Sequence, residues 1–281
     1  ASDYEYEDLA RKTSLQAEPL PTQNGSTVKW EFGNGIELWV QMDEHHWMTA
    51  LKPHFSGRHP QTIGITRCLA RLANPMDGSF EGWVNPRFSR GKEPGEIAGE
   101  YSILFDCPAF DWFRHLPVPL VARVELSAFA TDFEILDVLK ELSPGSLYPV
   151  ELAEEFFIPS GAFPPGGGEQ RTAQAVFGGR VLACQKLYNM ISQRDFHLAT
   201  IRTYGMDIDT VIAGQSLARP LVKGDLVRGR FWLSGNILEI IETFDPASPI
   251  YRRRKFGGDI YLAGVLYYEA EDVIEQLVFG E

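Results

Sequence analysis

Residues 118–130 read VPLVARVELSAFA, and this stretch decides the fold class. Every second residue is apolar and most of those between are polar, in the two series Ala122, Val124, Leu126, Ala128, Ala130 and Arg123, Glu125, Ser127. A period of two residues places one series on each face of an extended chain. The stretch therefore predicts a strand of an antiparallel sheet, buried on one face and exposed to solvent on the other.

Similar segments occur on both sides of this strand. They are rich in β-branched and aromatic residues and are separated by Gly, Pro and Asn. We expect strands at Ile36–Met42, Gln61–Leu69, Ser79–Val84, Tyr101–Phe105, Ala175–Gln185, Phe196–Tyr204, Asp207–Ala213 and Asp225–Ser234, with a further one at Gly258–Tyr268. The chain as a whole is predicted to be mostly β with minor α, in the all-β or the α+β class.

Two segments have helical features. Thr131–Glu134 fits a helix capping box and is followed by leucines at 136, 139 and 142, but the strand could equally continue through Phe133 and Ile135. Both alternatives stay open. Ala270–Phe279 has apolar residues at helical spacing and acidic residues in its first turn, which predicts a carboxyl-terminal helix.

Pro and Gly divide the chain into parts. Residues 1–26 are charged and rich in turn residues, so we expect a peripheral segment, and residues 27–142 form the expected amino-terminal β domain. Residues 143–170 hold the Pro/Gly-rich runs typical of a linker. Residues 171–281 are the expected second domain, ending in the helix.

The element order of the second domain carries a resemblance. Three expected strands, a short helical link at Gly214–Arg219 and a further strand follow one another between residues 171 and 240. This order resembles the oligonucleotide/oligosaccharide-binding (OB) fold, a five-stranded Greek-key barrel. The resemblance concerns element order in about a quarter of the chain, and no family motif accompanies it. It implies an OB-like barrel here; whether the amino-terminal half is a second such barrel stays open.

Composition indicates a soluble globular protein. The chain of 281 residues is 44% hydrophobic and has a formal net charge of −12. It lacks a run of about 18 apolar residues, so we expect no membrane insertion. Cys68, Cys107 and Cys184 are isolated in the sequence, which favours buried thiols and a cytoplasmic location over disulfides or structural zinc.

Positive charge is concentrated at residues 171–236, where nine Arg and Lys residues stand against four Asp residues. A basic island on an acidic protein can attract an anionic partner. On a strand, alternation places Arg228, Arg230 and Trp232 on one side, and Arg202 and Tyr204 share a side on their own strand. These five residues are the candidate binding face.

Three functions fit this face. Arg, Tyr and Trp are favoured at protein–protein contacts, and we expect a protein partner or self-association ahead of a nucleic acid. Cations with aromatic rings would also suit single-stranded nucleic acid. The face could instead be a solvated surface whose arginines pair with the surplus carboxylates.

An enzyme is the alternative class. Four of the six histidines lie in His45–His59, and a hairpin could bring His46 and His54 together as metal ligands, for a hydrolase or a metal-dependent enzyme. The cleft between the two domains is the other place for such a site. We assign no catalytic residue and expect no cofactor.

Overall fold

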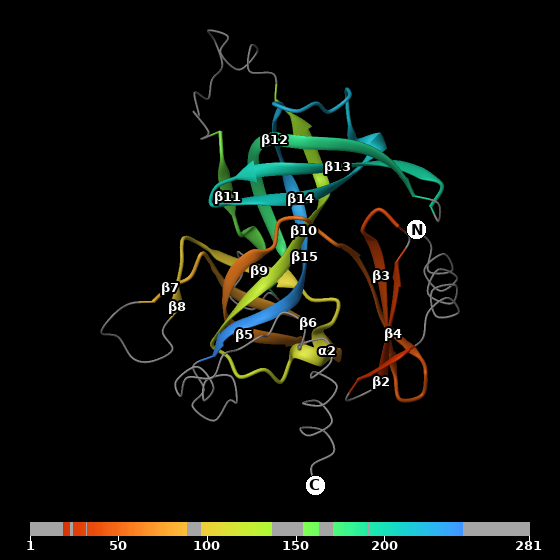
Figure 1. Cartoon of the computed structure of the whole chain (residues 1–281). Helices are drawn as coiled ribbons and strands as arrows, with labels where there is room; N and C mark the ends of the chain where they lie inside the picture. The colour runs from red at the N-terminus through yellow and green to blue at the C-terminus, as the bar shows by residue number, and fades with distance from the viewer. Residues whose placement is uncertain are drawn as a thin grey trace.

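The computed structural model describes residues 19–22, 25–31, 33–88, 97–136, 154–162, 171–189 and 192–243. These residues are mostly strands, as the sequence predicts, and fall into a small sheet and a large one (Figure 1). Among them, no helix has the length and apolar character that crossing a membrane would require.

The small sheet has four antiparallel strands in the order β1-β2-β3-β4. Their bounds are β1 Leu20–Thr22, β2 Gly25–Glu31, β3 Ile36–Asp43 and β4 Met48–Phe55. Positive φ angles at Gly33, Asn34 and Gly35 form the turn between β2 and β3. Strand β4 was not predicted from the sequence, because Lys52, Pro53 and His54 interrupt its apolar residues.

The large sheet has nine strands in the order β11-β12-β13-β14-β10-β15-β9-β6-β5. The strands are β5 Gln61–Arg71, β6 Asn74–Val84, β9 Ser102–Asp106, β10 Leu120–Ile135, β11 Phe156–Ile158, β12 Gln174–Asn189, β13 Arg194–Thr203, β14 Met206–Ala213 and β15 Leu226–Thr243. A short pair, β7 Arg87–Phe88 with β8 Ile97–Ala98, and the helical turns α2 Phe110–Phe113, η1 Ser160–Ala162 and η2 Gly214–Ser216 complete the fold.

Two extra pairings, β10 with β5 and β12 with β15, close the large sheet into two rings. One ring is β5-β6-β9-β15-β10 and the other is β12-β13-β14-β10-β15. The long antiparallel pair β10–β15 belongs to both rings. In each ring three consecutive antiparallel strands end in a parallel pairing, β9 with β15 in one and β14 with β10 in the other. The same strand arrangement thus occurs twice.

The repeat extends to single residues around the pair Ser127–Ser234, which are partners in the β10–β15 ladder. Ser127 lies beside Asp209, and Ser234 lies beside Asp106. Each aspartate accepts a hydrogen bond from a hydroxyl on the next strand: Thr200 Oγ1 donates to Asp209 at 2.7 Å, and Ser79 Oγ donates to Asp106 at 2.5 Å. The halves are therefore related by an approximate internal symmetry.

This arrangement changes the expected domain picture. The ring expected in residues 171–240 has five strands, but one of them is β10, from the first half. The ring of the first half likewise uses β15, from the second half. Neither an independent OB-like barrel nor a division into two domains is confirmed, because both rings need both halves of the chain.

The undecided segment after residue 130 is a strand: β10 continues through Phe133 to Ile135, where it pairs with β15. The other strands expected between residues 36 and 234 are confirmed, and β15 extends nine residues beyond Ser234, to Thr243. The predicted helix Ala270–Phe279 and strand Gly258–Tyr268 lie outside the described residues, as do most of the expected linker and the start of the chain.

Candidate functional site

An exposed face is formed by β11, β12, β15 and β10, which lie side by side near the end of the β10–β15 pair (Figure 1). Residues opposite each other in a sheet project to the same side. One row across the four strands consists of Ile158, Val176, Arg230 and Asp132. The next residues on the same side of β10 and β15 add Arg228 opposite Glu134 and Trp232 opposite Phe129. We call these eight residues the arginine face.

Trp232 fixes the inner border of the arginine face. Its ring packs on Phe129 with centroids 5.1 Å apart, and its Nε1 donates to Asp106 Oδ2 at 2.7 Å. Arg228 Nε donates to Glu134 Oε2 at 2.8 Å. Among the described residues, no ion pair of Arg230 is present, and its side chain is exposed.

The other two candidates, Arg202 and Tyr204, lie beyond β12 from the arginine face. Arg202 donates to both carboxylate oxygens of Asp207, and this hydrogen bonding raises the pKa of its guanidinium. The Tyr204 ring lies 5.8 Å from that of Tyr101. Arg202 lies opposite Arg180 of β12, and β12 in turn pairs with β15. Strand β12 therefore separates Arg202 and Tyr204 from the three candidates on β15.

The basic island of the sequence is largely neutralised in the fold. Six of its nine cations form ion pairs: Arg171–Glu81, Arg180–Glu154, Lys186–Asp195, Arg202–Asp207, Arg219–Asp225 and Arg228–Glu134. Three of these carboxylates, at positions 81, 134 and 154, come from outside the island. The surface there is one of mixed charge, which is a poor attractant for a polyanion.

A second set of polar side chains lies buried where β4 meets β10 and β15. His54 Nδ1 is 2.9 Å from Ser234 Oγ, and His54 Nε2 is 3.4 Å from Glu125 Oε2. Ser127 Oγ is 3.5 Å from the same His54 Nδ1. We call His54, Glu125, Ser127 and Ser234 the polar centre.

The alternation in β10 predicted that Glu125 and Ser127 face solvent, and this prediction was wrong: both residues are buried. The middle of β10 is buried on both faces, because β4 of the small sheet covers its polar side. Local sequence gave no sign of the polar centre beyond the polar residues Glu125 and Ser127 in β10. Their contact His54 comes from β4, a strand that was not predicted.

The polar centre has the composition of a Ser-His-acid hydrolase triad, but its geometry does not admit a substrate. The residues Ser127 and Ser234 are 0% exposed, and His54 is 1% exposed. A nucleophile must reach the substrate, so these hydrogen bonds serve to satisfy buried polar groups.

The loop that leaves β4 closes one side of this region. Asp209, itself buried, accepts hydrogen bonds from the backbone N–H of Arg58 at 2.6 Å and from Thr200, and lies 3.3 Å from the ring of His59. These contacts hold residues 56–60 against β14. His59 is therefore a structural contact of Asp209.

The predicted metal ligands are not brought together. His46 lies in the exposed turn between β3 and β4, whereas His54 is buried opposite Glu37, at the other end of that hairpin. The described part of the chain contains no group of three His, Cys, Asp or Glu side chains arranged to hold a metal ion.

Comparison with protein-family models, with curated proteins and with solved structures finds no match to this chain.

Proposed function

We propose that this protein is a non-catalytic binding or assembly protein whose arginine face binds a protein partner. The observation that supports this most is Arg230, an exposed guanidinium without an ion pair in the described structure, which lies opposite Val176 of β12 and two residues from Trp232 on its own strand. Ile158, which is 53% exposed, follows Val176 in the same row. Arginine beside aromatic and aliphatic side chains is the composition of binding hot spots in protein interfaces.

The same face argues against a polyanion as the partner. Asp132 lies opposite Arg230, and Glu134 lies opposite Arg228. A phosphate backbone would be repelled by both carboxylates, whereas a protein can match alternating charges with charges of its own. We therefore place a protein partner, or a second copy of this chain, ahead of single-stranded nucleic acid.

An enzymatic role has less support. The arrangement that most resembles catalytic machinery, the polar centre, is closed to solvent. We also propose a cytoplasmic location, which the three free cysteines support, since unpaired thiols persist where the compartment is reducing.

The test is site-specific photo-crosslinking in cells that produce the full chain. A photoreactive amino acid at position 176, within the arginine face, is expected to give a protein adduct of discrete mass. The same amino acid at position 67, on the exposed Arg67 of β5, serves as the control and is expected to give none. Arg230→Glu, which reverses one charge at an exposed site, is expected to abolish the adduct.

Analytical ultracentrifugation of the purified chain then separates self-association from a different partner. If the adduct joins two copies of this chain, the purified chain is expected to sediment as a dimer, and Arg230→Glu is expected to dissociate that dimer. Crosslinks to nucleic acid alone, or equal adducts at positions 176 and 67, would overturn the proposal.

A further inference from the structure

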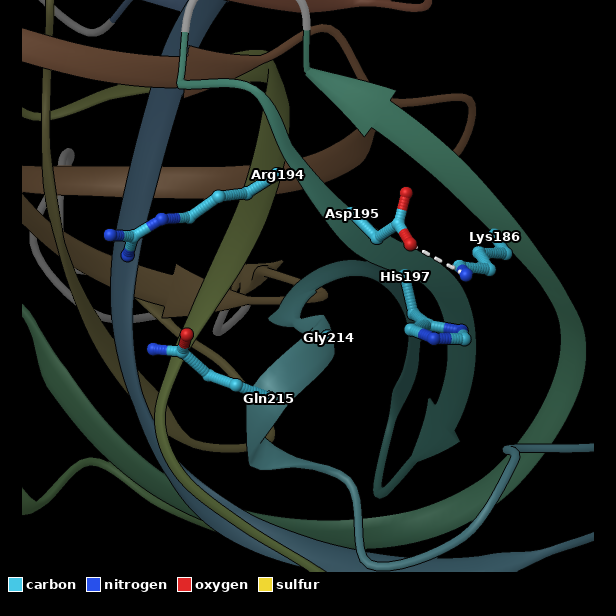
Figure 2. A pocket seen from close by; sticks show the side chains of 6 residues that line it. All are labelled: Lys186, Arg194, Asp195, His197, Gly214 and Gln215. Atoms are coloured by element: carbon cyan, nitrogen blue, oxygen red, sulfur yellow. Dashed lines mark ion pairs between the residues drawn. The ribbon is translucent and has the colours of Figure 1, made fainter.

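The side chains around the surface hollow in Figure 2 do not converge on a ligand. The hollow, of about 440 Å³, is lined by residues of β12, β13 and η2. Lys186 Nζ is already paired with Asp195 Oδ2 at 2.6 Å. Arg194 lies on the opposite face of β13 from Asp195 and His197, because successive side chains of a strand alternate. The surface that lacks a described partner lies instead on the small sheet.

The polar side of the small sheet faces the large sheet. Residues opposite each other on neighbouring strands project to the same side, and Lys29, Trp39 and Lys52 form one such row across β2, β3 and β4. Lys52 Nζ donates to the Cys107 carbonyl oxygen at 3.2 Å, and the rings of Trp39 and Trp112 are 6.1 Å apart. This side of the sheet therefore packs on the end of β9 and on α2.

The opposite side of the small sheet, which we call the outer face, is apolar. It consists of Val28, Trp30, Leu38, Val40, Met42 and Leu51. Val28 is 0% and Val40 is 1% exposed, yet the described residues of this apolar cluster all belong to the small sheet itself. Side chains on an open face of a sheet stay in contact with water. A further layer must therefore cover the outer face.

The cover of the outer face belongs to this chain, because Val28 and Val40 are buried in the single chain. It must come from the residues that the structure does not describe. Among these, residues 1–18 are the nearest: they directly precede Pro19 and β1, the edge strand of the small sheet.

The sequence of residues 1–18 has the pattern of one amphipathic helix. Ser2 and Glu5 fit a capping box at its start, and Pro19 disfavours helix at the residue before it. One face holds no charged residue and consists of Tyr6, Leu9, Ala10, Thr13 and Ala17, spaced three and four apart. A helix over residues 3–17 is about 22 Å long, and a strand of the length of β3 is about 26 Å long, so the two match.

We propose that residues 3–17 form a helix that packs on the outer face, with its uncharged stripe toward Val28 and Val40. An apolar stripe on a helix and an apolar side of a sheet are buried together when they pack as layers. The small sheet is then the middle of three layers, with the helix on its apolar side and the large sheet on its polar side. The outer face is occupied within the chain, so it is not a second docking surface for a partner.

Photo-crosslinking within the purified full chain tests this packing. p-Benzoylphenylalanine in place of Tyr6, on the uncharged stripe, is expected to give an adduct with an outer-face residue of the same chain, located by peptide mass spectrometry. The same amino acid in place of Tyr4 is the matched control, because position 4 lies on the charged side of the helix. It is expected to give no adduct with the outer face.

A pair of leucine variants tests the stripe itself, with the photoreactive residue kept at position 6. Leu9→Asp places a carboxylate between the helix and the apolar sheet and is expected to abolish the adduct. Leu15→Asp adds the same charge on the other side of the helix and is expected to leave the adduct yield unchanged.

Four results would overturn the proposal. They are no outer-face adduct from position 6, equal adducts from positions 6 and 4, an adduct that joins two copies of the chain, and an outer-face adduct from position 277 in its place. The last would assign the cover to the helix expected near the carboxyl end. The outer face and the arginine face lie on different sheets, so this result is independent of the partner experiment.

Discussion

Ser127 and Ser234 lie opposite each other in the middle of the β10–β15 pair, and each has a buried aspartate at the same level on the neighbouring strand. His54, from the small sheet, contacts both serine hydroxyls. The center of the repeated fold is thus polar rather than apolar. Buried polar groups of this kind need hydrogen-bond partners within the protein. Once these hydrogen bonds are made, they favour a single packing of the surrounding strands.

The two serines are predicted to contribute unequally to stability. Ser234→Ala removes the 2.9 Å contact to His54 and leaves the buried ring nitrogen with only the long 3.5 Å contact to Ser127, at a cost of about 1–3 kcal/mol. Ser127→Ala is the matched control: its contact is 3.5 Å long, so the expected cost is smaller. Urea denaturation of both variants measures the difference. Equal costs would show that His54 does not distinguish the two hydroxyls.

Asp106 is predicted to be essential for a stable fold. It accepts hydrogen bonds from Ser79, Arg71 and Trp232, and Asp106→Asn removes one of the two carboxylates that pair with the guanidinium of Arg71, the other being Asp77. Breaking a fully buried ion pair costs about 3–5 kcal/mol, and Arg71 is partly exposed, so the expected loss is somewhat below that.

The control for this prediction is Asp132→Asn, at an exposed position of the arginine face, with an expected effect within about 0.5 kcal/mol. Thermal unfolding monitored by circular dichroism compares the two variants. A loss at Asp106 no larger than at Asp132 would contradict the assignment of a structural role.

The two halves of the chain are predicted to stay associated after the backbone is cut between them. β10 and β15 pair along almost their whole length, and each ring takes a strand from the other half. A protease site introduced at Ser143–Gly145 therefore gives two fragments that are expected to elute together in gel filtration. They should separate only in denaturant. Separation of the fragments in native buffer would instead support two independent domains.

Most strands of this fold could be predicted from local sequence patterns, but its closure could not. Alternation in β10 and β15 correctly identified extended chain and put Arg228, Arg230 and Trp232 on one side. The pairing of β10 with both β5 and β14 joins residues far apart in the chain. No local pattern encodes such a partner, and the element order favoured a ring within residues 171–240.

The same limit applies to the candidate site. The count of basic residues at 171–236 was correct, but Glu134 and Glu81, which neutralise two of them, come from distant strands. Glu125 and Ser127 were expected to face solvent because an alternating pattern shows which face of a strand is polar, but not whether another strand packs over that face. Their cover is β4, whose His54 and Lys52 are themselves polar and so gave no strand signal.

Cys107 is predicted to be the least reactive of the three thiols. Its residue is 0% exposed, and burial is the main cause that raises the pKa of its thiol to about 12. At pH 8 an ordinary thiol with a pKa of about 8.5 is partly thiolate, the reactive form, whereas Cys107 is almost fully protonated. Alkylation with iodoacetamide followed by peptide mass spectrometry is expected to modify Cys107 only as the protein unfolds.

Cys184 is the internal control, because its side chain is only half-buried and it lies near the surface loop that contains Leu221.

The raised pKa of Cys107 also makes the stability of the fold depend on pH. The unfolded thiol ionises as the pH rises above about 8.5 and the folded one does not, so stability is lost between that value and about pH 12. Cys107→Ala should reduce this loss. Labelling of Cys107 at the rate of Cys184 in the folded protein would show that the region between the small sheet and β9 opens readily.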